Sequence, residues 1–383
     1  MILCDPAQGS SWIDYGIMIP FPPERPQRIL NFLAETAKNS AVKAGSVPGA
    51  VHQIDNSCWQ RLPSPCSDQP EKTRNTPHLP PIYHHLLRVH AQDYLDTLFG
   101  LHGEAALEQT ILNVYELLDD TGTPHRYDKT RAVNPLTALF RTVTLARLEG
   151  TYHAAQYALE TDEHFCFYLA GGNHHARYAT GAGFCLLNDL VYAARRLQAE
   201  GQARLIWFID VDAHKGCGST ELVTYIRNGT NPYPFEKHCN ILTLSAHMAR
   251  GWPLDEKTLA HAALGKAPCL PSDIEIPIEA GEEDLYCAKL SAGLMQIEAM
   301  SAGQQCDLAI VVDGSDPYEY DGLASSALLK LTRKQCLERD MLIYHFLRER
   351  NIPSAWTLAG GYGERAWEPA ATFLAALNDN RAG

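Results

Sequence analysis

Three side chains able to bind a metal or move a proton occur at alternate positions just after an apolar run. The segment WFIDVDAHKGCGST contains Asp210, Asp212 and His214, and the run RLIWFI (204–209) leads into them. Alternate residues of an extended chain share one face, so these three side chains point the same way. Two carboxylates and an imidazole at the end of a buried strand indicate a metal or acid–base site.

Four further apolar runs resemble this strand, and amphipathic stretches separate them. Strands are expected at 165–172, 203–212, 241–248, 308–316 and 353–363, with helices at 186–201, 219–228, 283–303 and 332–350. Regular alternation of strands and helices predicts βαβ units. The expected fold class is α/β, with three α-β-α layers: a mostly parallel sheet with helices on both faces.

Polar residues follow every one of these expected strands. They are His174, His175, Gly183 and Phe184 after the first strand, Ser245 and His247 in the third, Asp313, Asp316 and Asp321 around the fourth, and Gly360, Gly361 and Tyr362 at the fifth. In open α/β sheets the ligand crevice lies at the carboxyl ends of the strands. A single His or Asp there is usually structural, but five strand ends together predict a functional site.

The types of residue at these strand ends also suggest a metal. Asp212, His214 and Asp316 supply two carboxylates and one imidazole, and a catalytic zinc site takes three such ligands and keeps one position open. The donor set predicts a single zinc or ferrous ion. Among the cysteines, only Cys217 lies close to these ligands in the sequence.

The first 160 residues show fewer signals. Helices are expected at 29–43, 90–99 and 137–159, and the Pro-rich stretch 62–81 is expected to be a surface loop. Neither a linker nor an internal repeat divides the chain, so we expect one domain over residues 1–383.

Composition excludes several classes of protein. The net charge of -13, from 45 acidic and 32 basic residues, argues against nucleic-acid binding. No run approaches the roughly 18 apolar residues of a membrane helix, and the N-terminus lacks the features of a secretory signal. Eleven cysteines without a CxxC pair predict reduced thiols and a cytoplasmic location. The oligomeric state cannot be read from the sequence.

Seven stretches of the chain resemble the histone deacetylase superfamily, which includes acetylpolyamine amidohydrolases and histone-deacetylase-like amidohydrolases. In order along residues 22–363 they are PPERPQRI, RVHAQDYL, GGNHHARYATGAGFCLLND, IDVDAHKGCG, LTLSAH, GSDPYEYDGL and LAGGYG. The resemblance implies the arginase/deacetylase-like fold. It also implies a zinc-dependent amidohydrolase that acts on N-acetyl-lysine or a related acetylated amine, with no nucleic-acid or membrane partner.

The same resemblance assigns roles to individual residues. It implies that Asp212, His214 and Asp316 are the metal ligands and that His174 and His175 handle protons. Asp210 would orient the first of these histidines, and Tyr362 would hydrogen-bond the acyl oxygen.

Further roles implied by the resemblance concern the surroundings of the metal. Gly183 and Phe184 would form one wall of a narrow acyl-lysine tunnel, and Trp252 the opposite wall. Arg28 would lie near the acetate exit. An inner potassium ion would bind backbone carbonyls of Asp210, Asp212 and His214 together with Ser245 and Ala246.

Three positions depart from the family pattern. Lys215 replaces a histidine, Trp252 replaces the usual phenylalanine, and Cys217 stands where relatives carry an Asp or Asn that orients the second tandem histidine. A Cys217 thiol facing His175 would be a poor hydrogen-bond acceptor for the imidazole N–H.

Two alternative functions use the same fold. Arginase-like ureohydrolases also display the DAH motif, but their second manganese ion needs carboxylates at positions that are Asn173 and Gly216 here. A non-catalytic zinc- or acyl-lysine-binding protein would not need Tyr362 and both tandem histidines.

Overall fold

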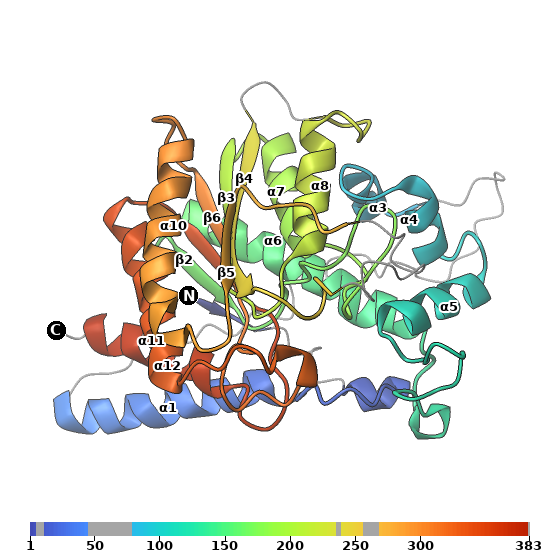
Figure 1. The fold of residues 1–383 in the computed structure, drawn as a ribbon, viewed down its shortest axis with the longest axis horizontal. Coiled ribbons are helices and arrows are strands. Elements are labelled where there is room, and N and C mark those ends of the chain that lie inside the picture. Colours follow the sequence, from blue (N-terminus) through green and yellow to red (C-terminus); the bar gives the residue numbers. More distant parts are fainter. Residues whose placement is uncertain (5–10, 45–78, 235–238, 256–267, 382–383) are drawn as a thin grey trace.

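A computed structural model of the chain describes residues 1–4, 11–44, 79–234, 239–255 and 268–381 (Figure 1). Most of the predicted Pro-rich loop at 62–81 lies outside these residues. None of the helices in the described part is long and apolar enough to cross a membrane.

A seven-stranded sheet forms the middle layer, and all of its strands are parallel. In sequence order the strands are β1 (Ile2–Leu3), β2 (Phe165–Tyr168), β3 (Leu205–Asp210), β4 (Asn240–Met248), β5 (Ile274–Ile278), β6 (Leu308–Asp313) and β7 (Ser354–Leu358). Their order in space is β1-β2-β7-β6-β3-β4-β5. The five predicted strands are confirmed, and the predicted α/β fold class is correct.

The two strands that the sequence did not predict, β1 and β5, lie at the edges of the sheet. Strand β5 reads IEIPI and alternates buried and exposed side chains. A proline at position 277 is tolerated there because an edge strand need not donate every backbone hydrogen bond. Strand β1 was missed because it has only two residues, and β5 because it lacks a continuous apolar run.

Helices cover both faces of the sheet, as expected (Figure 1). One face carries α1 (Arg25–Ala44), α10 (Tyr286–Met300), α11 (Arg333–Glu349) and α12 (Glu368–Arg381), and the other carries α6 (Leu145–Glu160), α7 (Asp189–Ala199) and α8 (Cys217–Arg227). Three further helices, α3 (Pro81–Leu86), α4 (Gln92–Leu98) and α5 (Glu104–Val114), pack beside α7 and the loops near it.

Helix α1 begins four residues earlier than predicted. It starts at Arg25, so Pro26 lies in its first turn, where the missing N–H of proline is harmless. Helices α3, α5 and α12 were not predicted.

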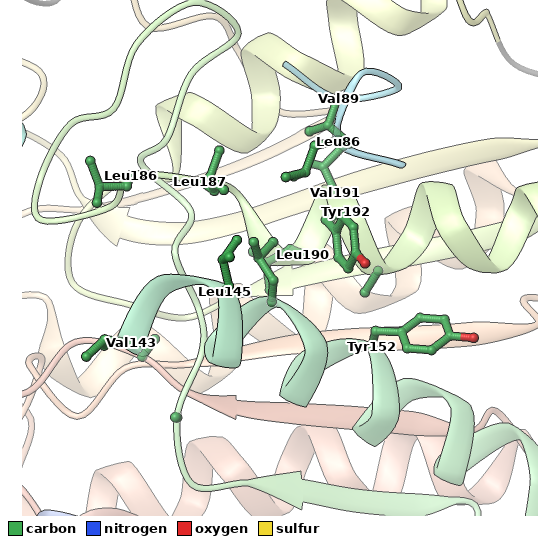
Figure 2. Packing of buried hydrophobic residues seen from close by; sticks show 14 of the residues in the cluster. Leu86, Val89, Val143, Leu145, Tyr152, Leu186, Leu187, Leu190, Val191 and Tyr192 are labelled. Carbon is green, nitrogen blue, oxygen red and sulfur yellow. The ribbon is translucent and has the colours of Figure 1, made fainter. Parts of the chain in front are cut away.

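Strand β3 shows how the sheet separates two apolar cores. Ile206 and Phe208 pack toward α6 and α7, whereas Leu205, Trp207 and Ile209 pack toward α10 and α11. Figure 2 shows the first of these cores, where side chains of α6 and α7 meet those of α3. A strand buried on both faces is held rigidly, and so are the residues that follow it.

Candidate active site

The acidic and histidine residues at the ends of β3 and β6 converge in the structure. These strands are neighbours, with Asp210 paired to Val312, so the loops that follow them emerge side by side. One ligand atom from each of Asp212, His214 and Asp316 lies within 4.8 Å of the others, and all three residues are buried. His214 Nδ1 is 2.8 Å from Asp316 Oδ2 and 3.3 Å from Asp212 Oδ1. This donor set fits a divalent metal ion.

Backbone N–H groups fix the orientation of both carboxylates. Ala213 donates to Asp316 Oδ1 at 2.9 Å, and Gly360 donates to Asp212 Oδ2 at 3.0 Å. A Cβ atom at position 360 would lie 2.5 Å from Asp212 Oδ2 and 2.6 Å from Asp316 Oδ2. Glycine is therefore required here, because any side chain would displace the carboxylates.

A buried arginine from α11 holds the two ligand-bearing loops together. Arg339 is fully buried, donates to the carbonyls of Val211 at 3.1 Å and Gly314 at 3.0 Å, and pairs with Asp313. The guanidinium thus connects the ends of β3 and β6, which carry Asp212 and Asp316.

The tandem histidines lie against this cluster with different partners. His174 Nδ1 is 2.7 Å from Asp210 Oδ2. Burial lowers the pKa of His174, but Asp210 and Asp212 outweigh it and raise the value to about 9. His175 Nδ1 has no hydrogen-bond partner. Burial, followed by the positive charges of His174 and His214, lowers the pKa of His175 well below its usual value. At neutral pH one imidazole is charged and the other neutral.

Tyr362 borders the same pocket from the loop after β7. Its backbone N–H donates to Asp321 Oδ2 at 2.7 Å, and its ring packs edge-on against Phe184, with centroids 6.1 Å apart. Burial and the nearby charges of Asp316 and Asp212 raise the pKa of the phenol well above its usual value. The hydroxyl stays protonated and can act as a hydrogen-bond donor.

Gly183 and Trp252 face each other beside the histidines. A Cβ atom at Gly183 would collide with the Trp252 ring and would lie 2.6 Å from His175 Cδ2. The Trp252 ring centroid is 4.5 Å from that of His175 and 5.3 Å from that of His214. The space between these residues is narrow, and it is here that the tunnel was expected.

Arg28, which was expected near an acetate exit, does not line the pocket. Its side chain is exposed, donates to the Glu364 carbonyl at 2.9 Å and pairs with Glu24. Arg25 lines the pocket instead, and it donates to Ala359 O at 2.7 Å, Gly360 O at 3.0 Å and Ser315 Oγ at 2.7 Å. Arg25 is the first residue of α1 and reaches the pocket, whereas Arg28 lies about one turn further along the helix and does not line it.

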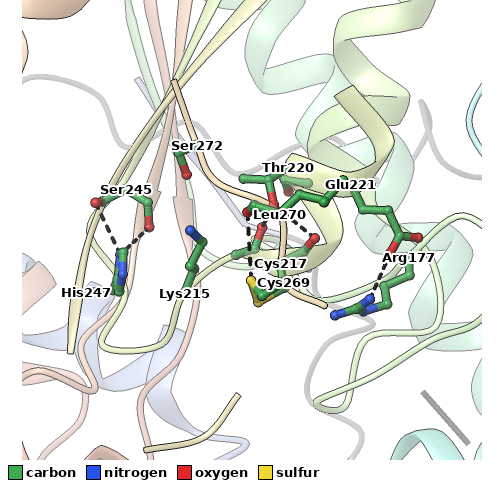
Figure 3. The surroundings of a disulfide bond; sticks show 12 residues. Arg177, Lys215, Cys217, Thr220, Glu221, Ser245, His247, Cys269, Leu270 and Ser272 are labelled. Atoms are coloured by element: carbon green, nitrogen blue, oxygen red, sulfur yellow. Dashed lines mark hydrogen bonds and ion pairs between the residues drawn. A yellow bond between two sulfur atoms is a disulfide. The ribbon is translucent and has the colours of Figure 1, made fainter. Parts of the chain in front are cut away.

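Cys217 is not a thiol facing His175, because it forms a disulfide with Cys269 (Figure 3). The expectation that the cysteines are reduced is wrong for this pair. Gly218, not Cys217, packs against the backbone of His175 and Ala176. Cys269 lies 52 residues away in the sequence, on the segment leading into β5, so no local pattern indicated the pairing.

The residues expected around an inner potassium ion lie together. Ser245 is paired with Asp210 in the β3–β4 ladder, and Ala246 follows it. Lys215 points away from the metal ligands and pairs with Glu275, whose carboxylate is also 3.6 Å from His247 Nε2 (Figure 3 shows Lys215, Ser245 and His247).

Several residues that line the pocket were not anticipated from the sequence. They are Trp12, Phe21, Arg25, Asn173 and Arg147. Arg25 and Asn173 lie within stretches singled out above, but Trp12 and Arg147 lie in segments without a recognisable motif. Their position follows from the packing of the N-terminal segment and α6 against the ends of the strands.

A parallel α/β sheet with a buried carboxylate–imidazole cluster at its carboxyl edge defines a class of proteins that bind a metal ion at the strand ends. The comparisons with known proteins specify it: residues 56–377 match the model of the histone deacetylase domain, and the chain belongs to that family.

Similarity to individual curated proteins is lower. The chain is 27% identical to histone deacetylase 2 of Arabidopsis thaliana over 72% of this chain and 60% of that protein. It is 27% identical to acetoin utilization protein AcuC of Bacillus subtilis over 57% of this chain and 51% of that protein. An uncharacterised protein of Picosynechococcus is 28% identical to this chain over 58% of this chain and 63% of that protein. The matched region thus spans about half to two thirds of these relatives.

Proposed function

We propose that this protein is a metal-dependent amidohydrolase that removes an acyl group, such as acetyl, from a lysine side chain or a related amine. The observation that carries the proposal is the convergence of three metal-binding side chains with a charged and a neutral imidazole in one buried pocket. Such a pocket combines the groups that amide hydrolysis at neutral pH requires.

Asp212, His214 and Asp316 would hold a zinc or ferrous ion, because they offer two carboxylates and one imidazole and no thiolate. When bound, such an ion lowers the pKa of a coordinated water and polarises the substrate carbonyl. Ser245 and Ala246, beside Asp210, are proposed to take part in an inner potassium site.

The chain's own groups divide the proton transfers between them. His175 is neutral at pH 7 and can accept a proton, since burial and its cationic neighbours disfavour its charged form. His174 stays protonated because Asp210 lies 2.7 Å from its Nδ1. A proton is therefore available for the amine that leaves.

Tyr362 stabilises the negative charge that develops on the acyl oxygen. Its phenol remains protonated in this acidic, buried environment and can donate to that oxygen. Gly183, Phe184 and Trp252 are proposed to surround a slender chain, such as the methylene chain of lysine or of a polyamine.

A ureohydrolase is a less suitable assignment. A second group of potential ligands, His174, His175 and Asp212, does exist and shares Asp212 with the first. However, Asp210 already engages His174 Nδ1, and Asn173 and Gly216 offer no carboxylate for a second ion. One ion per chain is therefore expected.

Turnover of acetylated amines tests the proposal. The metal-free and zinc-loaded proteins would be assayed on acetyl-lysine peptides, acetylputrescine and acetylspermidine, with arginine and agmatine as ureohydrolase substrates. Release of acetate that depends on the metal supports the assignment. Tight binding of acetyl-lysine without turnover would indicate a non-catalytic binding protein, and release of urea would indicate a ureohydrolase.

A further inference from the structure

The catalytic pocket contains an arginine that no other part of the described chain satisfies. Arg147, on α6, lines the pocket and is half-buried. Within the described residues its guanidinium has neither a hydrogen bond nor an ion pair, and its Nε is buried without a partner. A guanidinium carries five N–H donors, and leaving them unpaired in a partly desolvated place is unfavourable.

The guanidinium of Arg147 lies against two aromatic rings. Its central carbon lies 5.9 Å from the ring centroid of Trp12 and 5.6 Å from that of Phe21. Stacking of this kind holds the cation in place but leaves its donors free, because the interaction uses the plane of the guanidinium and not its edge. Arg25 differs, since it donates to two carbonyls and a hydroxyl.

Other unpaired donors line the same pocket. Of the eleven buried polar side-chain atoms without a partner in the described residues, five belong to residues that line it, and four of these, on Trp12, Arg25, Arg147 and Asn173, are nitrogens that can only donate. Trp12 Nε1 and Asn173 Nδ2 are among them, on side chains that are 4% and 7% exposed. A pocket rich in unpaired donors is suited to a ligand that carries acceptor oxygens.

Phe21 lies between these donors and Tyr362, the residue proposed to meet the acyl oxygen. Of the residues proposed to surround the amine chain, Gly183 and Phe184 line this pocket and Trp252 does not. Phe21 contacts both Arg147 and Trp12, and its ring centroid lies 6.5 Å from that of Tyr362. An acyl group whose oxygen meets Tyr362 therefore extends its far end toward Phe21, Trp12 and Arg147.

We propose that the preferred acyl group ends in a carboxylate that binds Arg147, with Trp12 Nε1 as a neutral donor beside it. The substrates would be amines acylated by a short dicarboxylic acid: malonyl, succinyl or glutaryl amides. Hydrolysis adds water across the amide, so that the C–N bond breaks, the amine takes a proton and the dicarboxylic acid leaves. This inference rests on the proposed amidohydrolase function.

The experiment compares acyl groups on one amine. Values of kcat/KM would be measured for the acetyl, butyryl and succinyl forms of the same lysine peptide, with wild type, Arg147→Gln and Arg147→Lys. Arg141→Gln, which removes an exposed cation just before α6, is the matched control. Because a hydrogen bond to a charged group is lost, Arg147→Gln should lower kcat/KM for the succinyl peptide about 10- to 150-fold. The butyryl value should change less than about threefold, since butyryl has no carboxylate to lose.

Three results would overturn the inference while leaving the proposed function intact. They are hydrolysis of acetyl and butyryl peptides without hydrolysis of the succinyl peptide, an equal loss for all acyl groups in Arg147→Gln, and an equal effect of Arg141→Gln. The charge-retaining Arg147→Lys variant should keep part of the succinyl activity, which a purely structural role would not predict.

A binding measurement decides the inference even if no amide is hydrolysed. N-methylsuccinamate and N-methylbutyramide would be titrated calorimetrically into wild type and Arg147→Gln, with melting temperatures recorded to confirm folding. Tighter binding of the carboxylate-bearing probe that disappears in the variant supports the inference. Equal binding of the two probes to wild type refutes it.

Discussion

A buried histidine ties together the two ends of the loop that carries Gly183 and Phe184. His90 is 1% exposed and lies between Arg177 and Asn188, which flank this loop. Its Nδ1 is 2.9 Å from Arg177 O, and its Nε2 is 3.1 Å from the backbone nitrogen of Asn188. Since the amide of Asn188 can only donate, Nε2 must accept and the ring must be neutral.

Protonation of His90 should therefore destabilise the fold and this loop in particular. Burial lowers the pKa of His90 to about 4, against the hydrogen bonds that raise it, from an ordinary value of 6.5. A group whose pKa is lowered in the folded state contributes stability above pH 6.5 and loses it as the pH falls toward 4. At 1.36 kcal/mol for each pH unit, the loss approaches about 3 kcal/mol.

Urea unfolding of wild type and His90→Gln between pH 4 and 8 measures this contribution. The difference in unfolding free energy between the two proteins should be constant above pH 7 and should change by about 3 kcal/mol between pH 6.5 and 4. His84→Gln, at an exposed position of α3, is the control and should parallel wild type. If the His90→Gln curve also parallels wild type at every pH, the reasoning is refuted.

Three further predictions concern the active site and the disulfide. Tyr362→Phe should lower kcat about 10²- to 10³-fold with unchanged metal content, because one donor to the acyl oxygen is removed; near-normal turnover would contradict this role. Elemental analysis should find one divalent ion per chain and none in Asp316→Ala, whereas two tightly bound ions would contradict a single site. A reductant should lower the stability of wild type by about 2–4 kcal/mol but leave Cys269→Ser unchanged, since the Cys217–Cys269 bond closes a long loop. Recovery of both cysteines as alkylated thiols from untreated protein would show that the bond is absent.

The sequence alone was sufficient to predict the sheet and the residues at its carboxyl edge. Strands β2, β3, β4, β6 and β7 are recognisable because each is buried on both faces and so is mostly apolar. Parallel strands direct all of their carboxyl ends to one edge. For that reason Asp212, His214 and Asp316 could be expected to meet although 104 residues separate the first from the last.

Edge strands and short helices were not predictable in the same way. Strand β5 has only one buried face, and β1 has two residues, so neither forms an apolar run. Strand β1 joins the sheet through backbone hydrogen bonds to β2, and β5 through backbone hydrogen bonds to β4. Backbone hydrogen bonds do not depend on residue type, so the sequence does not reveal them.

Tertiary structure decided the features that depend on segments brought together from far apart. Arg25 and Arg28 lie in one motif, and only the position of α1 relative to the strand ends decides that Arg25 lines the pocket and Arg28 does not. The motif around Cys217 was recognisable in the sequence, but its pairing with Cys269 depends on the position of the segment that leads into β5. Arg147 and Trp12 carried no signal at all. A side chain's chemistry is fixed by its type, whereas the groups that satisfy it, or leave it free for a ligand, are fixed only by packing.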